Sequence, residues 1–170
     1  MAEIQLVRGG IALIDDADAH LITGRYYEQR VKGSRTSYAR RAGPYRNDSL
    51  LHRAILDAPR GVFVDHINGN GLDNRRANLR LCSHRHNLAN RRKQTNNSRP
   101  YKGVTLKTEK FLRKPWVASI GGHASYAYLG IYATAEEAAA AYDIAAVLRY
   151  GEFACLNFPH VFPEVPTRKA

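Results

Sequence analysis

The chain has 170 residues, a length that suits one domain or two small ones. Its 26 basic and 15 acidic residues give a formal charge of +11 and an isoelectric point near 10.0. This excess favours a polyanionic partner, nucleic acid before an anionic membrane surface. A hydrophobic content of 44% argues against wholesale disorder, and no apolar run is long enough for a membrane-spanning helix.

The first residues lack a basic segment followed by a long apolar one, so no secretory signal is expected. The two cysteines, Cys82 and Cys155, lie far apart and form no CxxC pair. A disulfide framework and a four-cysteine zinc site are therefore not expected, and a reducing compartment fits.

The first 50 residues are predicted to form mostly strands, because short apolar runs alternate with turn residues. We expect strands at 4–7, 11–14 and 36–40, a short helix opened by the acidic residues 15–18, and a helix at 50–56 that ends before Pro59.

The middle of the chain predicts a strand, a long loop, a strand and a helix. The apolar run 62–64 meets the Asn-Gly-rich segment 68–74, which tolerates positive φ and reverses the chain. A second strand is expected at 79–81, and Ser83 is a suitable N-cap for a helix over 84–92.

Residues 94–100 are polar without an apolar period and are predicted to be a linker. Three strands are expected beyond it, at 101–106, 116–120 and 126–132. A helix follows from Thr134, which forms a T-x-x-E capping box with Glu137. Its predicted apolar face consists of Ala138, Ala141, Ala145 and Leu148, and Gly151 suits its C-terminal end. These elements predict a three-stranded sheet with one helix on one side and the other side free.

The positive charge is concentrated in three segments. Residues 24–46 hold seven basic residues against one acidic, 75–93 hold seven against none, and 99–114 hold six against one. From residue 115 onward the balance reverses, with three basic residues against five acidic. Clusters of one sign favour an extended anionic ligand over an ordinary solvated surface.

Three residues in the middle segment could carry phosphodiester hydrolysis. Asp65 and Asn87 offer hard oxygen donors suited to Mg²⁺, and His66 could activate water. Neighbours on a strand point to opposite faces, but at a twisted strand end both Asp65 and His66 can face one cleft. An Asp-His pair is also often only a polar pair in a loop.

The run Asp65-His66, Asn78-Leu79 and then Asn87 resembles the HNH nucleases of ββα-metal fold. It is closest to the phage and intron homing endonucleases in which asparagine replaces the last histidine, and the resemblance extends upstream through 51–53. It implies that His66 is the general base, that Asp65 and Asn87 bind one divalent cation, and that Asn78 fixes the loop by hydrogen bonding. His86 is an alternative to Asn87, which we prefer because its spacing from Asp65 matches the asparagine version.

Two other interpretations of this segment remain open. Cys82, His84 and His86 could form a zinc cluster, although one cysteine with closely spaced histidines is a weak signal. His52 suits a structural role, or a phosphate contact beside Arg53, better than a catalytic one.

The C-terminal blocks resemble the AP2 DNA-binding domain over about 60 residues: 101–104, 116–120, 128–132, 134–143 and 151–159. The resemblance implies that the sheet lies in the DNA major groove. Trp116 and the tyrosines could instead pack in the core, because strands alternate faces.

We therefore expect an α+β protein with an HNH module and β-rich extension at 1–93, a linker at 94–100, an AP2-like module at 101–160 and a tail at 161–170. The expected function is that of a metal-dependent, homing-type endonuclease that acts on double-stranded DNA and uses Mg²⁺, with Mn²⁺ as a substitute. We expect a monomer that has no organic cofactor and no membrane partner. The expected location is the cytoplasm of a bacterial or phage-infected cell, at the nucleoid. A non-catalytic DNA-binding regulator and an RNA-binding accessory protein are the alternatives. The expected DNA contacts are His52, Arg53, Arg75, Arg76, Arg85, Arg91, Arg92, Lys102, Lys107, Arg113, Trp116, His123 and Tyr128.

Overall fold

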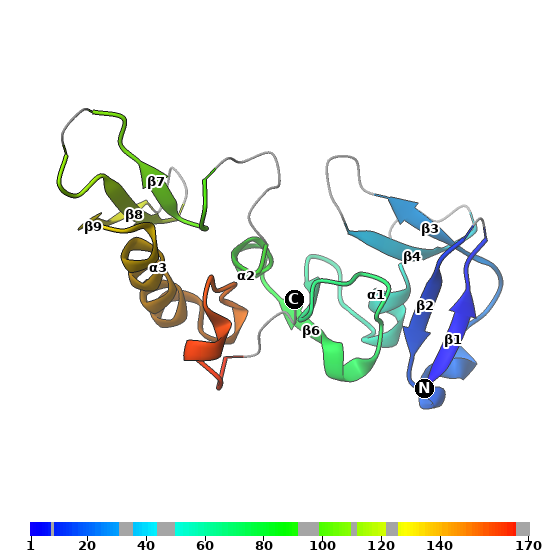
Figure 1. The fold of residues 1–170 in the computed structure, drawn as a ribbon. Coiled ribbons are helices and arrows are strands. Elements are labelled where there is room, and N and C mark those ends of the chain that lie inside the picture. Colours follow the sequence, from blue (N-terminus) through cyan, green and yellow to red (C-terminus); the bar gives the residue numbers. More distant parts are fainter. Residues whose placement is uncertain are drawn as a thin grey trace. The chain divides into compact units, whose positions relative to one another are not determined.

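The fold was taken from a computed structural model, which describes residues 1–7, 9–30, 36–43, 50–91, 99–109, 112–121 and 126–165. The chain divides into two compact units, Met1–Asn87 and Leu88–Thr167 (Figure 1). Among the described residues, the first contains two-stranded sheets and the second one three-stranded sheet, each unit with few helices. This mixed architecture confirms the α+β class. Within the described ranges, no helix is long and apolar enough to cross a membrane.

The first unit begins with two antiparallel hairpins (Figure 1). β1 (Ala2–Gln5) pairs with β2 (Ile11–Ile14), and β3 (Tyr26–Arg30) pairs with β4 (Ser37–Arg41). A short 3-10 helix, η1 (Asp16–Leu21), lies between the hairpins. The sequence pattern does not predict β3, because its Glu28-Gln29-Arg30 half lacks apolar residues; the buried ring of Tyr26 anchors it.

The predicted strand, loop, strand and helix are present in the middle of the chain. After α1 (Leu51–Ile55), β5 (Phe63–His66) pairs antiparallel with β6 (Leu79–Cys82). The 67–78 loop between them ends in the turn η2 (Arg76–Asn78). The Ser83 hydroxyl accepts a hydrogen bond from the His86 amide at 3.2 Å and so caps α2 (His84–Ala89), as predicted. The helix ends at Ala89, earlier than the predicted 92, which itself lies outside the described residues.

One hydrophobic core joins the N-terminal hairpins to this middle segment. The core brings β2, β3 and β4 together with α1 and β6, through the buried side chains of Leu6, Ala12, Ile14, Tyr26, Ala39, Leu51, Ile55 and Leu79. The β-rich extension is therefore part of the same folded body as β5 and β6, and it can fix the position of the loop between them.

The second unit is a three-stranded antiparallel sheet with one helix packed on it (Figure 1). The strands are β7 (Val104–Leu106), β8 (Trp116–Ile120) and β9 (Ala127–Tyr132), and the helix is α3 (Ala135–Tyr150). The capping box of Thr134 and Glu137 is present as predicted. Two 3-10 turns, η4 (Gly151–Phe153) and η5 (Pro159–Val161), follow the helix.

The buried face of α3 differs from the predicted one. Ala135, Ala138, Ala139, Tyr142 and Ala146 are buried, whereas Leu148 is 84% exposed. Alanines occur all round this helix, so their period does not define one face. The large ring of Tyr142 packs in the core and turns Leu148 outward, so the predicted face was wrong at that position.

The boundary between the two units falls between Asn87 and Leu88, inside α2. The predicted boundary lay at residues 93 and 94, beside a linker at 94–100. Residues 92–98 lie outside the described part of the chain, so the linker and the four-segment division remain predictions.

Candidate functional site

The 67–78 loop is held by a set of internal hydrogen bonds centred on Asn78. The Asn78 side-chain oxygen accepts from the Asn68 amide at 2.9 Å, and its amide group donates to the Asp73 carbonyl at 2.7 Å. The Asn68 side chain also donates to the Asp73 carboxylate at 2.8 Å. Asn78 thus bridges both sides of the loop; its consequence for catalysis remains a prediction.

The N-terminal hairpin braces the far side of this loop. The Leu13 amide donates to the Leu72 carbonyl, and the Asn74 amide donates to the Leu13 carbonyl, both at 2.8 Å. Gly71 allows β4 to approach, because a Cβ there would lie 2.3 Å from the Ser37 carbonyl oxygen. The loop that follows Asp65 and His66 is therefore fixed from two directions.

His66 is buried at the end of β5 beside two other rings. Its ring lies 5.0 Å from His52 in an edge-to-face arrangement and 5.7 Å from Tyr38. His66 Nε2 lies 3.4 Å from Asn74 Oδ1. If Nε2 carries the proton, it donates to this oxygen, and the lone pair of the neutral ring is then on Nδ1.

His52 forms the wall behind His66. Its side chain is only 6% exposed, and its Nδ1 has no hydrogen-bond partner among the described residues. Burial lowers the pKa of His52 to about 3, and His66 and Arg53 act in the same direction. His52 is therefore a neutral, buried packing partner of His66, which supports the structural role; the phosphate contact remains a prediction.

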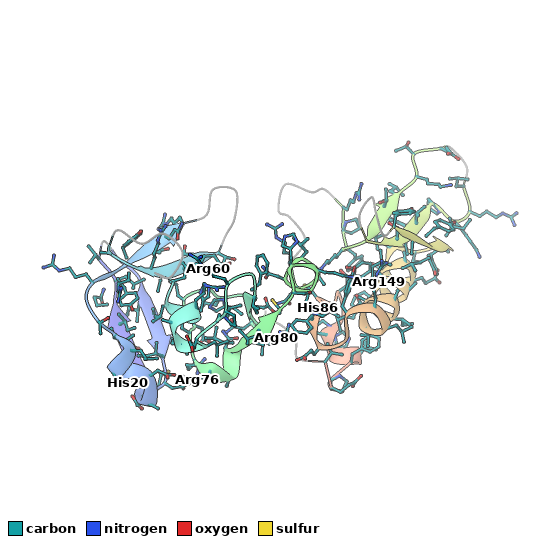
Figure 2. The ribbon with its side chains drawn as sticks, turned by 180° about the vertical axis from the view of Figure 1, so that it is seen from behind. His20, Arg60, Arg76, Arg80, His86 and Arg149 are labelled. Carbon is teal, nitrogen blue, oxygen red and sulfur yellow. The ribbon has the colours of Figure 1, made fainter. Side chains whose placement is uncertain are left out.

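Asp65 is engaged by an arginine of the neighbouring strand. Asp65 and Arg80 are directly paired in the β5–β6 register, and Arg80 Nε and Nη2 donate to Asp65 Oδ2 at 3.0 and 2.9 Å. Figure 2 labels Arg80. Both side chains are largely buried. A cation bound by Asp65 would have to share this carboxylate with Arg80.

A pocket of about 420 Å³ lies next to the ring cluster. Its lining includes Tyr38, His52, Arg53, Arg60, Phe63 and Asn87. Asn87 therefore shares a cavity wall with His52, the contact partner of His66, and His86 is not among the lining residues. Asp65 and His66 are not among the lining residues either, so the choice of Asn87 over His86 stays a prediction.

The donor chemistry of Asp65 and Asn87 fits a magnesium ion. One carboxylate and one amide oxygen are hard donors, and Mg²⁺ commonly keeps several waters and takes only one or two protein ligands with substrate phosphate. In the part of the chain that the structure describes, no three His, Cys, Asp or Glu side chains are grouped to hold a metal. That finding gives no support to the zinc cluster of Cys82, His84 and His86. Burial also raises the pKa of the Cys82 thiol to about 11, so it is protonated at neutral pH.

Several predicted DNA-contacting arginines of the first unit are engaged within the fold. Arg53 donates to the carbonyls of Ala58, Pro59 and Val62 at 2.6–2.8 Å. Arg75 holds the Asp73 carboxylate through two bonds of 2.7 Å, and its hydrogen bonds lower the pKa of that carboxyl. Arg76 is bonded to the buried carboxylate of Asp18.

Arg85 and Arg91, two further predicted contacts, lie on the surface, while Arg92 falls outside the described residues. The net charge of the sequence therefore overstates the positive charge that is free to bind a partner.

The predicted DNA contacts of the second unit divide between the two faces of the sheet. Trp116 packs against the core cluster on the side covered by α3, which is the packing alternative considered from the sequence. Lys102 donates to the carbonyls of Ala89 and Arg91, so its ammonium is engaged inside the unit. The exposed Tyr128 pairs with Ser119 on the face that α3 leaves free. Lys107 and Arg113 are exposed, and His123 lies outside the described residues.

The sequence did not single out four residues of this site: Tyr38, Asn74, Arg80 and Arg60. Arg80 lies opposite Asp65 in the β5–β6 register. A register worked out from the two predicted strands could have found this pair. Tyr38 and Asn74 carry no such signal, because they reach the site through tertiary contacts.

Comparison with known proteins agrees with this geometry. Residues 57–89 match the family model described as HNH endonuclease, a range that contains β5, the 67–78 loop, β6 and α2. The match supports an HNH nuclease and implies a DNA substrate. No solved structure matches the chain.

Proposed function

We propose that the chain is a metal-dependent, homing-type HNH endonuclease that nicks or cleaves double-stranded DNA. The observation that carries this proposal is the match of residues 57–89, which includes all four predicted site residues: Asp65, His66, Asn78 and Asn87. The buried imidazole of His66, contacted by Asn74 at Nε2, supports the role of general base.

In the proposed reaction, His66 takes a proton from the water that attacks the scissile phosphate. Asn78 keeps the 67–78 loop in place, and His52 and Tyr38 hold the His66 ring by packing. A divalent ion, Mg²⁺ or Mn²⁺, would be held by Asp65 and Asn87 and would supply charge stabilisation at the phosphate. Arg80 keeps the Asp65 carboxylate oriented through two hydrogen bonds.

The second unit is proposed to be an AP2-like module that positions the nuclease on a longer site. Its three-stranded sheet with one covering helix supports this assignment, as does the position of Tyr128 on the free face. Lys107 and Arg113 are the proposed phosphate contacts there, whereas Trp116 and Lys102 serve the fold. One active site per chain predicts that a monomer nicks one strand in each event.

Incubation of supercoiled plasmid with the full chain tests the proposal, with Mg²⁺, Mn²⁺ or EDTA in parallel. We expect conversion to open circles with either metal and none in EDTA. Intact plasmid in every metal, at protein concentrations where DNA binding is demonstrated, would contradict the nuclease assignment.

One observation favours a second candidate, a DNA-binding regulator that no longer cuts. Asp65 Oδ2 already accepts two hydrogen bonds from Arg80, and such an ion pair competes with a metal for the carboxylate. A regulator would bind DNA without a divalent metal and would leave the plasmid uncut in Mg²⁺ and in Mn²⁺.

A further inference from the structure

Arg60 lines the pocket next to the ring cluster, and its guanidinium makes no polar contact within the described part of the fold. It is exposed, it lines the pocket with His52 and Asn87, and it lies between α1 and β5 (Figure 2). Among the residues that the structure describes, it has no hydrogen-bond or ion-pair partner. Sequence patterns alone do not distinguish Arg60 from Arg53.

The backbone presents Arg60 at the corner of a tight turn. The Val62 amide donates to the Pro59 carbonyl at 3.2 Å, which closes a four-residue turn over 59–62. Gly61, at the third position of this turn, has a φ of 82°, the positive value that a type II turn requires there. The Arg60 side chain therefore projects from a fixed backbone and not from a loose loop.

Arg53 makes this turn rigid from inside. Its guanidinium donates to Val62 O at 2.6 Å and to Ala58 O and Pro59 O at 2.8 Å, so one cation binds carbonyls on both sides of Arg60. Three of the five N–H donors of this guanidinium are taken by backbone acceptors, including both N–H groups of Nη2, which reduces what it can offer a phosphate. Arg53 thus acts as a brace, and the charge available to a ligand is that of Arg60.

We propose that Arg60 binds a backbone phosphate of the DNA strand seated at this pocket, and that Arg53 only positions the turn that presents it. This inference rests on the proposed DNA nuclease function and adds a binding residue to its site. A planar guanidinium on a rigid corner suits bidentate pairing with phosphate oxygens. Arg60 and Asn87, one of the two proposed metal ligands, line the same pocket, so that phosphate would occupy a cavity that Asn87 also faces.

The test measures binding of the full chain to a labelled 30-base-pair duplex by fluorescence anisotropy in EDTA, over a series of KCl concentrations. Log K falls linearly with log salt, and the loss of one phosphate contact makes this slope less steep by about 1. It also weakens binding to all sequences alike. We expect this for Arg60→Gln, with affinity lower by roughly 5- to 10-fold near 100 mM salt. Arg60→Lys keeps the charge and should retain most of the slope.

Two comparisons make the result specific. Arg149→Gln removes the same charge from α3 and should leave the slope unchanged. The double variant Arg53→Gln/Arg60→Gln should show the slope of Arg60→Gln alone, because Arg53 contributes no contact of its own. Circular dichroism of each variant verifies that it is folded.

Three results would overturn the proposal. If the wild type binds and nicks DNA and Arg60→Gln keeps the wild-type slope and affinity, the phosphate contact of Arg60 is refuted while the nuclease function stands. A double variant whose slope falls by about 2 shows that Arg53 contacts phosphate directly. A wild-type chain that neither binds nor nicks DNA refutes the inference together with the nuclease function on which it rests.

Discussion

The buried histidine behind the proposed base makes the first unit sensitive to acid. His52 is 6% exposed, and burial lowers its pKa from an ordinary 6.5 to about 3. Between these values the unfolded chain binds a proton that the folded chain does not. The contribution of neutral His52 to the unfolding free energy is therefore fully present above pH 6.5 and is lost as the pH falls toward 3. Replacing His52 by leucine, which is of similar size and cannot titrate, removes this dependence.

The magnitude follows from the separation of the two pKa values. One pH unit within the window costs about 1.4 kcal/mol, so acidification from pH 7.5 to 5.0 should lower the unfolding free energy by about 2 kcal/mol through His52. With a urea dependence of about 1–3 kcal/mol per molar, the unfolding midpoint should move down by roughly 1 M. The difference between wild type and His52→Leu isolates this contribution from those of other groups.

Urea unfolding followed by far-ultraviolet circular dichroism at several pH values measures the effect. Trp116, the only tryptophan, lies in the second unit, so its fluorescence serves as an internal reference that His52→Leu should not change. His20→Leu is the matched control, because His20 is exposed. Equal pH dependence of stability in wild type and His52→Leu would refute the reasoning and show that His52 is hydrated or protonated in the folded chain.

Three more substitutions test the scaffold of the two units, two in the first and one in the second. Gly71→Ala should destabilise the first unit by about 1–3 kcal/mol, because its methyl group would overlap the Ser37 carbonyl; Gly43→Ala, with open space around it, should not, and urea unfolding compares the two. Asn78→Ala should lower the unfolding free energy by about 1–3 kcal/mol in the same measurement, because it leaves the Asn68 amide and the Asp73 carbonyl without their partner. The fraction of Asn78→Ala protein that remains folded should also nick plasmid more slowly than wild type. Thr134→Ala should lower the stability reported by Trp116 fluorescence by about 1 kcal/mol, and an unchanged midpoint would show that the capping box does not stabilise α3.

The sequence predicts those parts of the fold that depend on local chemistry. Ser83 and Thr134 begin helices because each can accept a backbone hydrogen bond within one turn, and the structure confirms both caps. The face of α3 was predicted wrongly because it depends on Tyr142, whose burial follows from packing and not from the alanine period.

The candidate site shows the same division between local and tertiary information. The spacing of Asp65, His66, Asn78 and Asn87 was visible in the chain, and the family match covers it. The partners of these residues were not visible: Asn74, Tyr38 and Arg80 reach them through the loop, a neighbouring hairpin and a cross-strand pair. Counting charges also failed to separate Arg53, whose guanidinium binds three carbonyls, from the free Arg60.

The central claim is that His66 drives phosphodiester cleavage in a metal-dependent site. Its most direct test is the single-turnover nicking rate of supercoiled plasmid in Mn²⁺, measured with the full chain at saturating concentration so that binding does not limit the rate. We predict that His66→Ala lowers this rate by about 100-fold or more while its DNA affinity in EDTA is unchanged. The exposed His20→Ala should nick as fast as wild type. A His66→Ala protein that binds and nicks at the wild-type rate would contradict the account.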